Sequence, residues 1–398
     1  MKVLINMKEV FVIYNEILYI AFIYLSETDG IAKKVLSQAR GFSKSMQKCS
    51  LLCCEDDSIV HLEIINGEIV NKTIKSRLNQ VGSNSKERIM TIKELIEVAN
   101  ALIKNEKMLI YIRHMIPTVS HIRFLKNAKL SGHKIGYEIP TYPYYYEQFH
   151  VAHNKMKAII KICNDIIHWP LIYKYVDNIY TIMSNSNSKV YKKMYLIKNG
   201  VEINTKIKFT EKKNEDKFNL IGVGTIWPYH GYDRVIDAIM ESKGKLENGL
   251  DIYFHVVGES DEISKLERYC KLNNLTGHVI FHGKKFGNDL NELYNISHIG
   301  VGTLALNKRN ADIDTAIKNI EYLSKSLPIV TSGKIFDISE DSNLYFISKN
   351  DQIIDLNEVY KFYKSYKNLY KKDILEKTLV EFSWDSITKD IIRNLNNI

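Results

Sequence analysis

In the first half of the chain, short apolar runs alternate with segments in which apolar residues recur every three or four positions. This alternation is typical of strands followed by amphipathic helices. It opens with a strand over 16–25, a polar turn over 26–30 and a helix from about Ile31. Further strands are predicted over Lys107–Arg113 and Lys134–Ile139, and further helices over Thr118–Lys129 and Gln148–Ile167. This order predicts an α/β domain with a parallel sheet covered by helices.

A second series of the same kind follows a polar, charged segment. Residues 205–217 have almost no apolar periodicity, so we place a linker there. The later strands are expected over Phe218–Val223, Ile252–Val257, Val279–Phe281, Ile299–Val301 and Pro328–Val330, and the helices over 231–242, 261–272, 288–296 and 314–326. Two consecutive α/β domains enclose a cleft, where ligands bind at the carboxyl ends of strands.

These patterns divide the chain into four parts. We predict a first domain over 1–204, in which 1–15 form an extra strand or an extension. The linker over 205–217 leads to a second domain over 218–380, and a terminal segment over 381–398 completes the chain.

The net charge of +9 is concentrated in the first half of the 398-residue chain. Residues 1–200 hold 28 Lys and Arg against 17 Asp and Glu (+11), whereas residues 201–398 hold 27 against 29 (−2). This asymmetry predicts that one domain meets an anionic surface or substrate, such as nucleic acid, phospholipid headgroups or pyrophosphate. The 45% hydrophobic and 25% charged content is that of a globular protein and excludes wholesale disorder.

The spacing of the cysteines and the length of the apolar segments indicate the cellular compartment of the protein. The five cysteines follow no zinc-binding spacing, so we interpret them as reduced core thiols in the cytoplasm. The apolar stretch Val10–Leu25 is interrupted by Asn15 and Glu16, and no small-residue cleavage site follows it. We therefore expect neither a membrane span nor a signal peptide.

Gly222-Val-Gly224 ends a predicted strand and precedes a predicted helix. It lacks the third glycine of a dinucleotide fingerprint, but a glycine turn at a helix start lets phosphate oxygens reach backbone N–H groups. His230 stands beside Gly231 at that helix start. These residues are candidates for a pyrophosphate site, with an ordinary turn as the alternative.

Other candidates lie near predicted strand ends. Arg113 closes an apolar strand, where a charge at a cleft edge would meet an anion. Tyr142 belongs to the aromatic run Thr141–Tyr146, which is either a stacking platform or an ordinary loop. Asp312-Ile-Asp314 has the spacing of a divalent-metal pair, but such a pair is expected by chance in a chain of this composition.

Several short sequence motifs occur in the same order as in one known family. In the first half they are Thr28–Lys34, which includes Gly30, then Tyr111–Arg113, Glu138–Pro143 and Ile197–Val201. In the second half they are Gly222–Arg234, His255–Glu259, Phe281–Gly283, Ala316–Val330 and Phe382–Trp384. As an ordered set over about residues 17–398, they resemble the retaining GT-B glycosyltransferases, specifically the bacterial "group 1" enzymes that build exopolysaccharides and capsules.

This resemblance implies two Rossmann-like domains facing a cleft, with a C-terminal helix that crosses back to the first domain. It also implies that the second domain binds a nucleotide-diphosphate sugar. Glu321 would accept hydrogen bonds from the ribose hydroxyls. Backbone N–H groups near Gly224 and Thr225, with His230 and Lys318, would meet the charge on the leaving diphosphate.

The resemblance also assigns residues to the sugar and the acceptor. Asp312 or Asp314, preferably Asp314, would hold a hydroxyl of the donor sugar. Glu138 would lie near the sugar and the acceptor hydroxyl, and Arg113 would face an acceptor phosphate or the donor diphosphate. The residues assigned to the acceptor side are Gly30, Arg113 and Tyr142.

The chain departs from the family's pattern at the acidic and basic positions. Ile313 stands where the first Glu of the Glu-x7-Glu pair is expected, eight positions before Glu321. Thr225 replaces the usual Arg and His230 the usual Lys. The cationic clamp is therefore reduced unless Arg234 or Lys318 contributes.

The resemblance implies transfer of a sugar from a nucleotide-diphosphate sugar to a saccharide or polyprenyl-diphosphate-linked acceptor, with retention, in surface polysaccharide synthesis. We expect no metal or other cofactor, because the leaving phosphate serves as the base by family analogy. The expected location is the cytoplasm, with peripheral contact at the anionic inner face of the cell membrane. The alternatives are a catalytically silent sugar-nucleotide-binding subunit and an epimerase or phosphorylase of the same architecture. A nucleic-acid-binding protein would need a motif that this sequence does not show.

Overall fold

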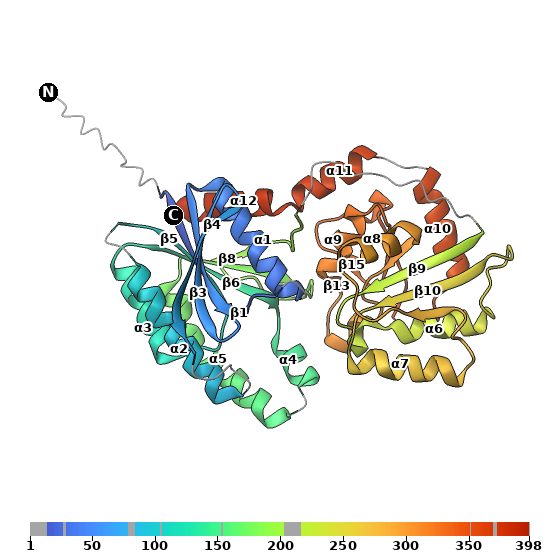
Figure 1. Ribbon diagram of the computed structural model, residues 1–398, viewed down its shortest axis with the longest axis horizontal. Helices are drawn as coiled ribbons and strands as arrows, with labels where there is room; N and C mark the ends of the chain where they lie inside the picture. The colour runs from blue at the N-terminus through green and yellow to red at the C-terminus, as the bar shows by residue number, and fades with distance from the viewer. Residues whose placement is uncertain are drawn as a thin grey trace.

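A large sheet in each half of the chain organises the molecule into two lobes (Figure 1). The computed structural model describes residues 14–26, 29–78, 84–103, 106–152, 154–202, 216–350, 352–368 and 372–397. Most of the predicted linker, and most of the predicted extension over 1–15, lie outside these ranges. The expected α/β architecture of two domains is confirmed.

The first domain contains an eight-stranded sheet of order β4-β3-β2-β1-β5-β6-β7-β8. Neighbouring strands are parallel except for the β2–β3 and β3–β4 pairs. The strands are β1 (Glu16–Tyr24), β2 (Lys48–Glu55), β3 (Ser58–Ile65), β4 (Glu68–Arg77), β5 (Leu109–Arg113), β6 (Lys134–Tyr142), β7 (Asn178–Met183) and β8 (Met194–Leu196).

The prediction of a fully parallel first sheet is wrong at β2–β4. These strands form two antiparallel hairpins with short turns. In the second turn, Asn66 and Gly67 have φ values of 51° and 86°. Asn-Gly is a strong signal for a two-residue hairpin turn, because such a turn needs positive φ at both positions. The sequence thus carried the information for the second of these hairpins.

The described part of the first half contains the helices α1 (Gly30–Ser45), α2 (Ser85–Leu102), α3 (Val119–Leu130), α4 (Tyr145–Val151) and α5 (Lys155–Tyr175). The single helix predicted over Gln148–Ile167 is wrong, because α4 and α5 are separate. Asn154 begins the second of them: its side chain accepts a hydrogen bond from Lys157 N (3.0 Å), which caps α5. The break lets α4 extend toward the second domain (Figure 1).

The second domain has a parallel six-stranded sheet of order β11-β10-β9-β12-β14-β16 and a two-stranded sheet, β13-β15. Its strands are β9 (Lys217–Val223), β10 (Asp251–Val257), β11 (Val279–Phe281), β12 (Ile299–Val301), β13 (Ile313–Asp314), β14 (Ile329–Thr331), β15 (Lys334–Ile335) and β16 (Tyr345–Ile347). Its helices are α6 (Tyr232–Glu241), α7 (Asp261–Leu272), α8 (Gly287–Ile296), α9 (Ile317–Ser324), α10 (Leu356–Asn368) and α11 (Lys372–Glu381), with 3-10 turns η1 (Pro228–His230), η2 (Leu306–Arg309) and η3 (Glu340–Ser342).

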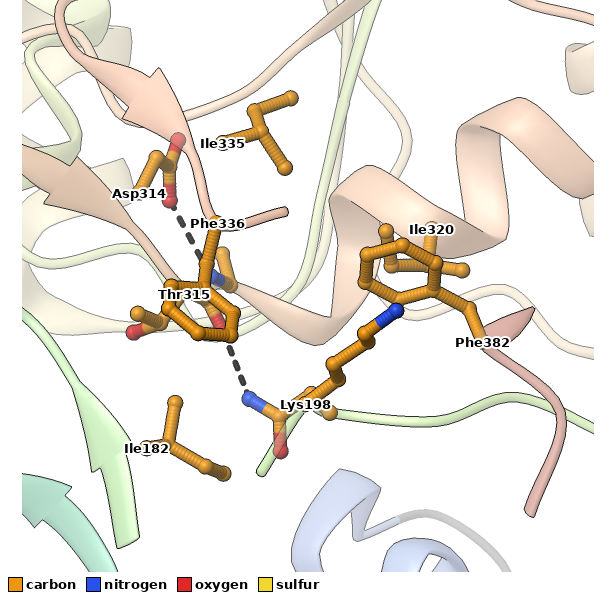
Figure 2. Close-up of a pocket in the computed structure, with 10 residues that line it drawn as sticks. Ile182, Lys198, Asp314, Thr315, Ile320, Ile335, Phe336 and Phe382 are labelled. Atoms are coloured by element: carbon orange, nitrogen blue, oxygen red, sulfur yellow. Dashed lines mark hydrogen bonds between the residues drawn. The ribbon is translucent and has the colours of Figure 1, made fainter. Parts of the chain in front are cut away.

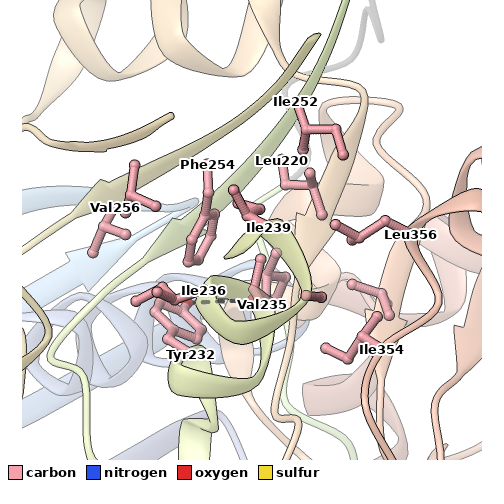
Figure 3. Packing of buried hydrophobic residues seen from close by; sticks show 14 of the residues in the cluster. Leu220, Tyr232, Val235, Ile236, Ile239, Ile252, Phe254, Val256, Ile354 and Leu356 are labelled. Atoms are coloured by element: carbon pink, nitrogen blue, oxygen red, sulfur yellow. Dashed lines mark hydrogen bonds between the residues drawn. The ribbon is translucent and has the colours of Figure 1, made fainter. Parts of the chain in front are cut away.

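The core of this domain fixes where β9 meets α6. Val235, Ile236 and Ile239 of α6 are fully buried among the side chains of β9 and β10 (Figure 3). A Cβ at Gly222 would overlap the ring of Tyr232, so glycine is required for this close helix–strand contact. The packing holds the start of α6 and the preceding η1 at the carboxyl end of β9.

The last helix, α12 (Trp384–Asn396), packs on α1 of the first domain. Trp384 is buried against the first domain, and a Cβ on Gly200 would lie 2.7 Å from its ring. A backbone bridge joins Val201 to Ser383. The chain therefore returns to its first domain after completing the second, as Figure 1 shows.

Two predictions concern the cellular compartment: that the chain lacks a membrane span, and that its cysteines are reduced core thiols. Within the described ranges, none of the helices combines the length and the apolar character needed to cross a membrane. All five cysteines are free, and Cys49, Cys53, Cys54 and Cys270 are buried as predicted. Cys163 is exposed on α5, so the interpretation of that residue as a core thiol is wrong.

Candidate functional site

The glycine loop at the end of β9 lies at the surface. Gly224 and Thr225 are exposed, and Gly224 adopts a φ of 126° that side-chain-bearing residues rarely take. The N–H of Gly224 donates to Val257 O (3.0 Å), so this amide is already used. A role of this loop toward a diphosphate therefore rests on the next residue, Thr225.

His230 ends η1 and is buried. Its Nδ1 accepts a hydrogen bond from Trp227 N (2.8 Å), which leaves the ring proton on Nε2. Burial, and then the charges of Lys318 and Arg309, hold the pKa of His230 well below its usual value. His230 is thus a neutral hydrogen-bond donor at neutral pH.

Lys318 and Asp314 lie beside His230 in the same domain. Lys318 is buried in the first turn of α9, and its Nζ donates to Tyr232 Oη (3.1 Å). Burial lowers the pKa of Lys318 to about 7, and the charge of Asp314 opposes this only partly. The ammonium therefore has few partners in the protein, and an anionic ligand would stabilise it.

Asp314 is buried and well supplied with donors. Its carboxylate accepts hydrogen bonds from Thr303 N (2.8 Å), Thr303 Oγ1 (3.0 Å), Thr331 Oγ1 (2.8 Å) and Ala316 N (3.1 Å). A sugar hydroxyl would have to replace one of these. The role of Asp314 toward the donor sugar stays a prediction.

Glu321 lies one turn after Lys318 on α9 and is exposed to solvent. Surrounding protein nevertheless desolvates it enough to raise its pKa, with Lys33 and Lys325 acting in the opposite direction. Lys33 belongs to α1 of the first domain, and its ammonium lies 5.6 Å from the centre of the Phe286 ring. Glu321 is therefore close enough to the first domain for the charge of Lys33 to act on its carboxylate.

Asp312 serves the contact between domains. It accepts a hydrogen bond from Ser186 N (2.8 Å) and another from Ser186 Oγ, both in the loop after β7. Its own N–H donates to Ser184 O (3.1 Å). Asp312 and Asp314 therefore bind different partners. Among the described residues, no three His, Cys, Asp or Glu side chains form a group that could hold a metal ion.

Glu138 lies inside the first domain rather than on its surface. It has no exposed area, and both carboxylate oxygens are used: Oε1 by Lys34 (3.2 Å) and Arg113 (2.7 Å), Oε2 by Gln38 (2.9 Å) and Tyr111 (2.9 Å). Burial alone would raise its pKa, but these neighbours outweigh that and hold it at about 2. The contact of Glu138 with an acceptor stays a prediction. In this conformation Glu138 pairs with two cations, Lys34 and Arg113.

The other acceptor-side candidates are separate from this cluster. Gly30 opens α1, but the amides of its first turn are capped by Asp29, which accepts from Ile31 N and Ala32 N (2.7 and 2.8 Å). Tyr142 donates to Lys189 O (3.1 Å) at the end of β6. Neither residue contacts Glu138 or Arg113 through a hydrogen bond within the described ranges.

A cavity of about 1070 Å³ opens beside the carboxyl ends of β5 and β6. It is walled by α2, α4 and α5, and its volume suits a large ligand. Its ionisable lining consists of Arg88, Lys93, His114, Glu147, Lys157, Lys161 and His168. The sequence indicated the basic character of this domain but not the cavity, because α2 is far from α4 and α5 along the chain.

The domains also enclose a much smaller void, of about 20 Å³. It lies among Asp314, Thr315, Ile182 and Phe382 (Figure 2). Asn199, which also lines it, donates from Nδ2 to Thr315 O (2.6 Å). This volume holds about one water. The cation–carboxylate group around His230 and the large cavity are therefore the candidates for ligand binding.

Residues 203–339 match the family model described as "Glycosyl transferases group 1". This segment is therefore similar to group 1 glycosyltransferases. The match includes the glycine loop, His230, Asp314, Lys318 and Glu321. The glycosyltransferase domain thus coincides with the half of the chain in which we expected the donor nucleotide.

Solved structures resemble the whole chain. The lipopolysaccharide outer core galactosyltransferase WaaB in its apo form is 14% identical over 96% of this chain and 98% of its own, with a TM-score of 0.58. Sucrose-phosphate synthase from Thermosynechococcus elongatus is 13% identical over 95% and 98%, with a TM-score of 0.63. An E. coli structure titled trehalose-6-phosphate, bound with UDP-2-fluoro glucose, is 10% identical over 96% and 99%, with a TM-score of 0.60. At these identities the likeness shows the GT-B fold alone, and no curated protein sequence matches the chain.

Proposed function

We propose that this glycosyltransferase moves a sugar from a nucleoside-diphosphate sugar to a saccharide or polyprenyl-diphosphate-linked saccharide, with retention of anomeric configuration, in surface polysaccharide synthesis. The observation that carries the proposal is that a buried cation, Lys318, lies beside a neutral imidazole, His230, one helical turn before the exposed carboxylate of Glu321. The first domain adds a cavity with a basic lining.

The donor half of the proposal rests on charge. A departing nucleoside diphosphate gains negative charge, which fixed positive groups and N–H donors stabilise best in a desolvated site. Lys318 supplies a buried ammonium and His230 an Nε2–H donor. Glu321 would accept hydrogen bonds from the ribose hydroxyls, and Thr225 would donate to a phosphate oxygen. The neighbour bound with UDP-2-fluoro glucose supports this class of donor.

Arg234 and Lys318 are the two cations considered for binding the donor diphosphate, and Arg234 has another role. Its guanidinium donates to Ser348 Oγ (3.2 Å) and Gln352 O (2.6 Å), which tie down loops of the same domain. Lys318 is therefore the residue that we assign to the diphosphate.

The acceptor half of the proposal rests on the large cavity. Its lining combines apolar residues with Arg88, Lys93, Lys157 and Lys161, against a single lining carboxylate, Glu147. Such a wall suits an amphipathic acceptor that carries phosphate. In the retaining mechanism that the resemblance implies, the leaving phosphate takes the acceptor proton, so no catalytic pair of carboxylates is needed and none is assigned.

Membrane contact is proposed on the exposed face of α5. Met156, Ile160 and Ile167 are 66%, 64% and 70% exposed. The same helix carries Lys155, Lys157, Lys161 and Lys174 and a single acidic residue, the buried Asp165. Apolar side chains among lysines fit the headgroup region of an anionic bilayer. This surface borders the cavity, because Ile160 and Lys161 also line it.

The test is transfer with a panel of UDP-, GDP- and ADP-sugars, with short polyprenyl-diphosphate saccharides as acceptors. We expect one donor to yield a larger saccharide and a nucleoside diphosphate, with the product anomer matching the donor by NMR. Isomerised donor without transfer would instead show the epimerase alternative. Tight nucleotide binding with no turnover on any acceptor would favour the silent subunit.

A further inference from the structure

Arg309 ends η2 and joins the two domains. It pairs with Glu147 of α4 (3.0 Å), and its guanidinium carbon lies 5.1 Å from the centre of the Tyr229 ring. Arg309 is close enough to His230 to help lower the pKa of that residue. The side chain is only 11% exposed. Arg309 thus lies between η1, which follows the glycine loop, and α4, which forms part of the cavity wall.

One edge of this guanidinium lacks a protein acceptor. The Nε of Arg309 is buried and has no hydrogen-bond partner among the described residues. A buried guanidinium N–H without a partner is costly, so such a group in a cleft indicates a missing acceptor. An oxyanion fits this place, because guanidinium offers parallel N–H donors to carboxylate or phosphate.

The charges of the surrounding groups favour an anion too. The glycine loop offers N–H and hydroxyl donors but no cation, and His230 is neutral. The nearby ions are Lys318, Arg309 and Lys308 against Asp314, Glu147 and Asp233, and Lys308 is exposed and already pairs with Asp233 (3.5 Å). Asp314 already accepts four hydrogen bonds inside its own domain and so is partly neutralised. Lys318 and Arg309 are therefore the cations that remain for a diphosphate of two or more negative charges.

We infer that Arg309 is a second diphosphate-binding cation of the donor site, held in place by Glu147 of the opposite domain. This inference rests on the proposed function and names a residue that sequence reasoning did not identify. Glu147 is a positioning residue: its carboxylate pairs with one terminal nitrogen of the guanidinium and leaves Nε without an acceptor. Because Glu147 belongs to α4 of the first domain, Arg309 is held in this position only when the two domains are together.

The experiment is calorimetric titration of the full chain with UDP, GDP and ADP, and with the matching nucleoside of whichever binds. For Arg309→Gln we expect the diphosphate to bind roughly 10- to 100-fold more weakly, the range for a lost hydrogen bond to a charged group. The nucleoside should bind as it does to the unmodified chain. Arg309→Lys should recover part of the loss. Arg393→Gln is the matched control, because Arg393 makes only an exposed pair with Asp390 on α12 (3.1 Å).

Glu147→Ala tests the positioning role. It should weaken diphosphate binding roughly 3- to 10-fold alone, and it should add nothing in the Arg309→Gln background, as coupled residues do in a double-mutant cycle. Equal affinity of Arg309→Gln and unmodified protein for the diphosphate would overturn the inference. Tighter binding by Glu147→Ala would overturn the positioning role, since the carboxylate would then be a competitor. If no nucleoside diphosphate binds the unmodified chain, the proposed function itself fails.

Discussion

Lys318→Met should stabilise the protein while it weakens donor binding. Lys318 is buried, and its pKa falls from 10.5 to about 7. Each unit of pKa corresponds to about 1.4 kcal/mol, so the buried charge carries an upper bound of about 5 kcal/mol at pH 7. Methionine loses the hydrogen bond to Tyr232, but Asp314 keeps its own four donors. We therefore expect a net gain of about 1–3 kcal/mol, well below the upper bound because Tyr232 loses a donor and Asp314 loses a neighbouring cation.

The pH dependence of this gain is distinctive. Between pH 7 and 10.5 the unfolded chain keeps the Lys318 proton that the folded chain releases, so the stability of the unmodified protein rises with pH over that window. The advantage of Lys318→Met should be full at pH 6.5 and shrink toward pH 10. Urea unfolding midpoints followed by circular dichroism measure it. Lys308→Met, at an exposed lysine of η2, is the control and should change stability by less than about 0.5 kcal/mol. A less stable variant, or a gain that does not vary with pH, would refute this reasoning.

Other expectations concern structure around the cleft. Glu138→Gln should cost about 2–4 kcal/mol in urea unfolding, because Lys34 and Arg113 lose their shared carboxylate, and adding Lys34→Met should recover part of this loss. In the unmodified protein, the stability from Glu138 should be present above pH 4.5 and disappear as the pH falls toward 2; acid unfolding that is unchanged in Glu138→Gln would contradict this. Gly258→Ala should cost more than about 2 kcal/mol, because its Cβ would overlap Gly224 O and its φ of 137° suits only glycine. A thermal midpoint equal to that of the unmodified chain would refute this.

Much of the second domain could be predicted from the sequence. Its strands are short, uniformly apolar and separated by amphipathic helices, so periodicity alone located β10, β11, β12 and α7 closely. The helix predicted over 314–326 instead begins as strand β13 and becomes α9 at Ile317, because Asp314 pairs with Thr303 and Thr331 rather than capping a helix.

The site was predicted less completely than the fold. Lys318, His230 and Asp314 do lie together, as their neighbouring motifs indicated. The sequence could not show that Glu138 is buried among Lys34 and Arg113, because strand position does not say which helix covers a strand end. Arg309 and Glu147 are 162 residues apart and meet only through the domain arrangement, so no local spacing connects them.

The central claim, that the second domain binds a donor nucleotide through Glu321, is tested most directly by calorimetric binding of UDP, GDP and ADP in the presence of EDTA. We expect one nucleotide to bind the unmodified chain, and Glu321→Ala to bind it roughly 10- to 100-fold more weakly, the effect of losing hydrogen bonds to a carboxylate. Glu267→Ala, at an exposed glutamate of α7, should bind like the unmodified chain. Absence of binding by all three nucleotides, or equal affinity of Glu321→Ala, would contradict the account.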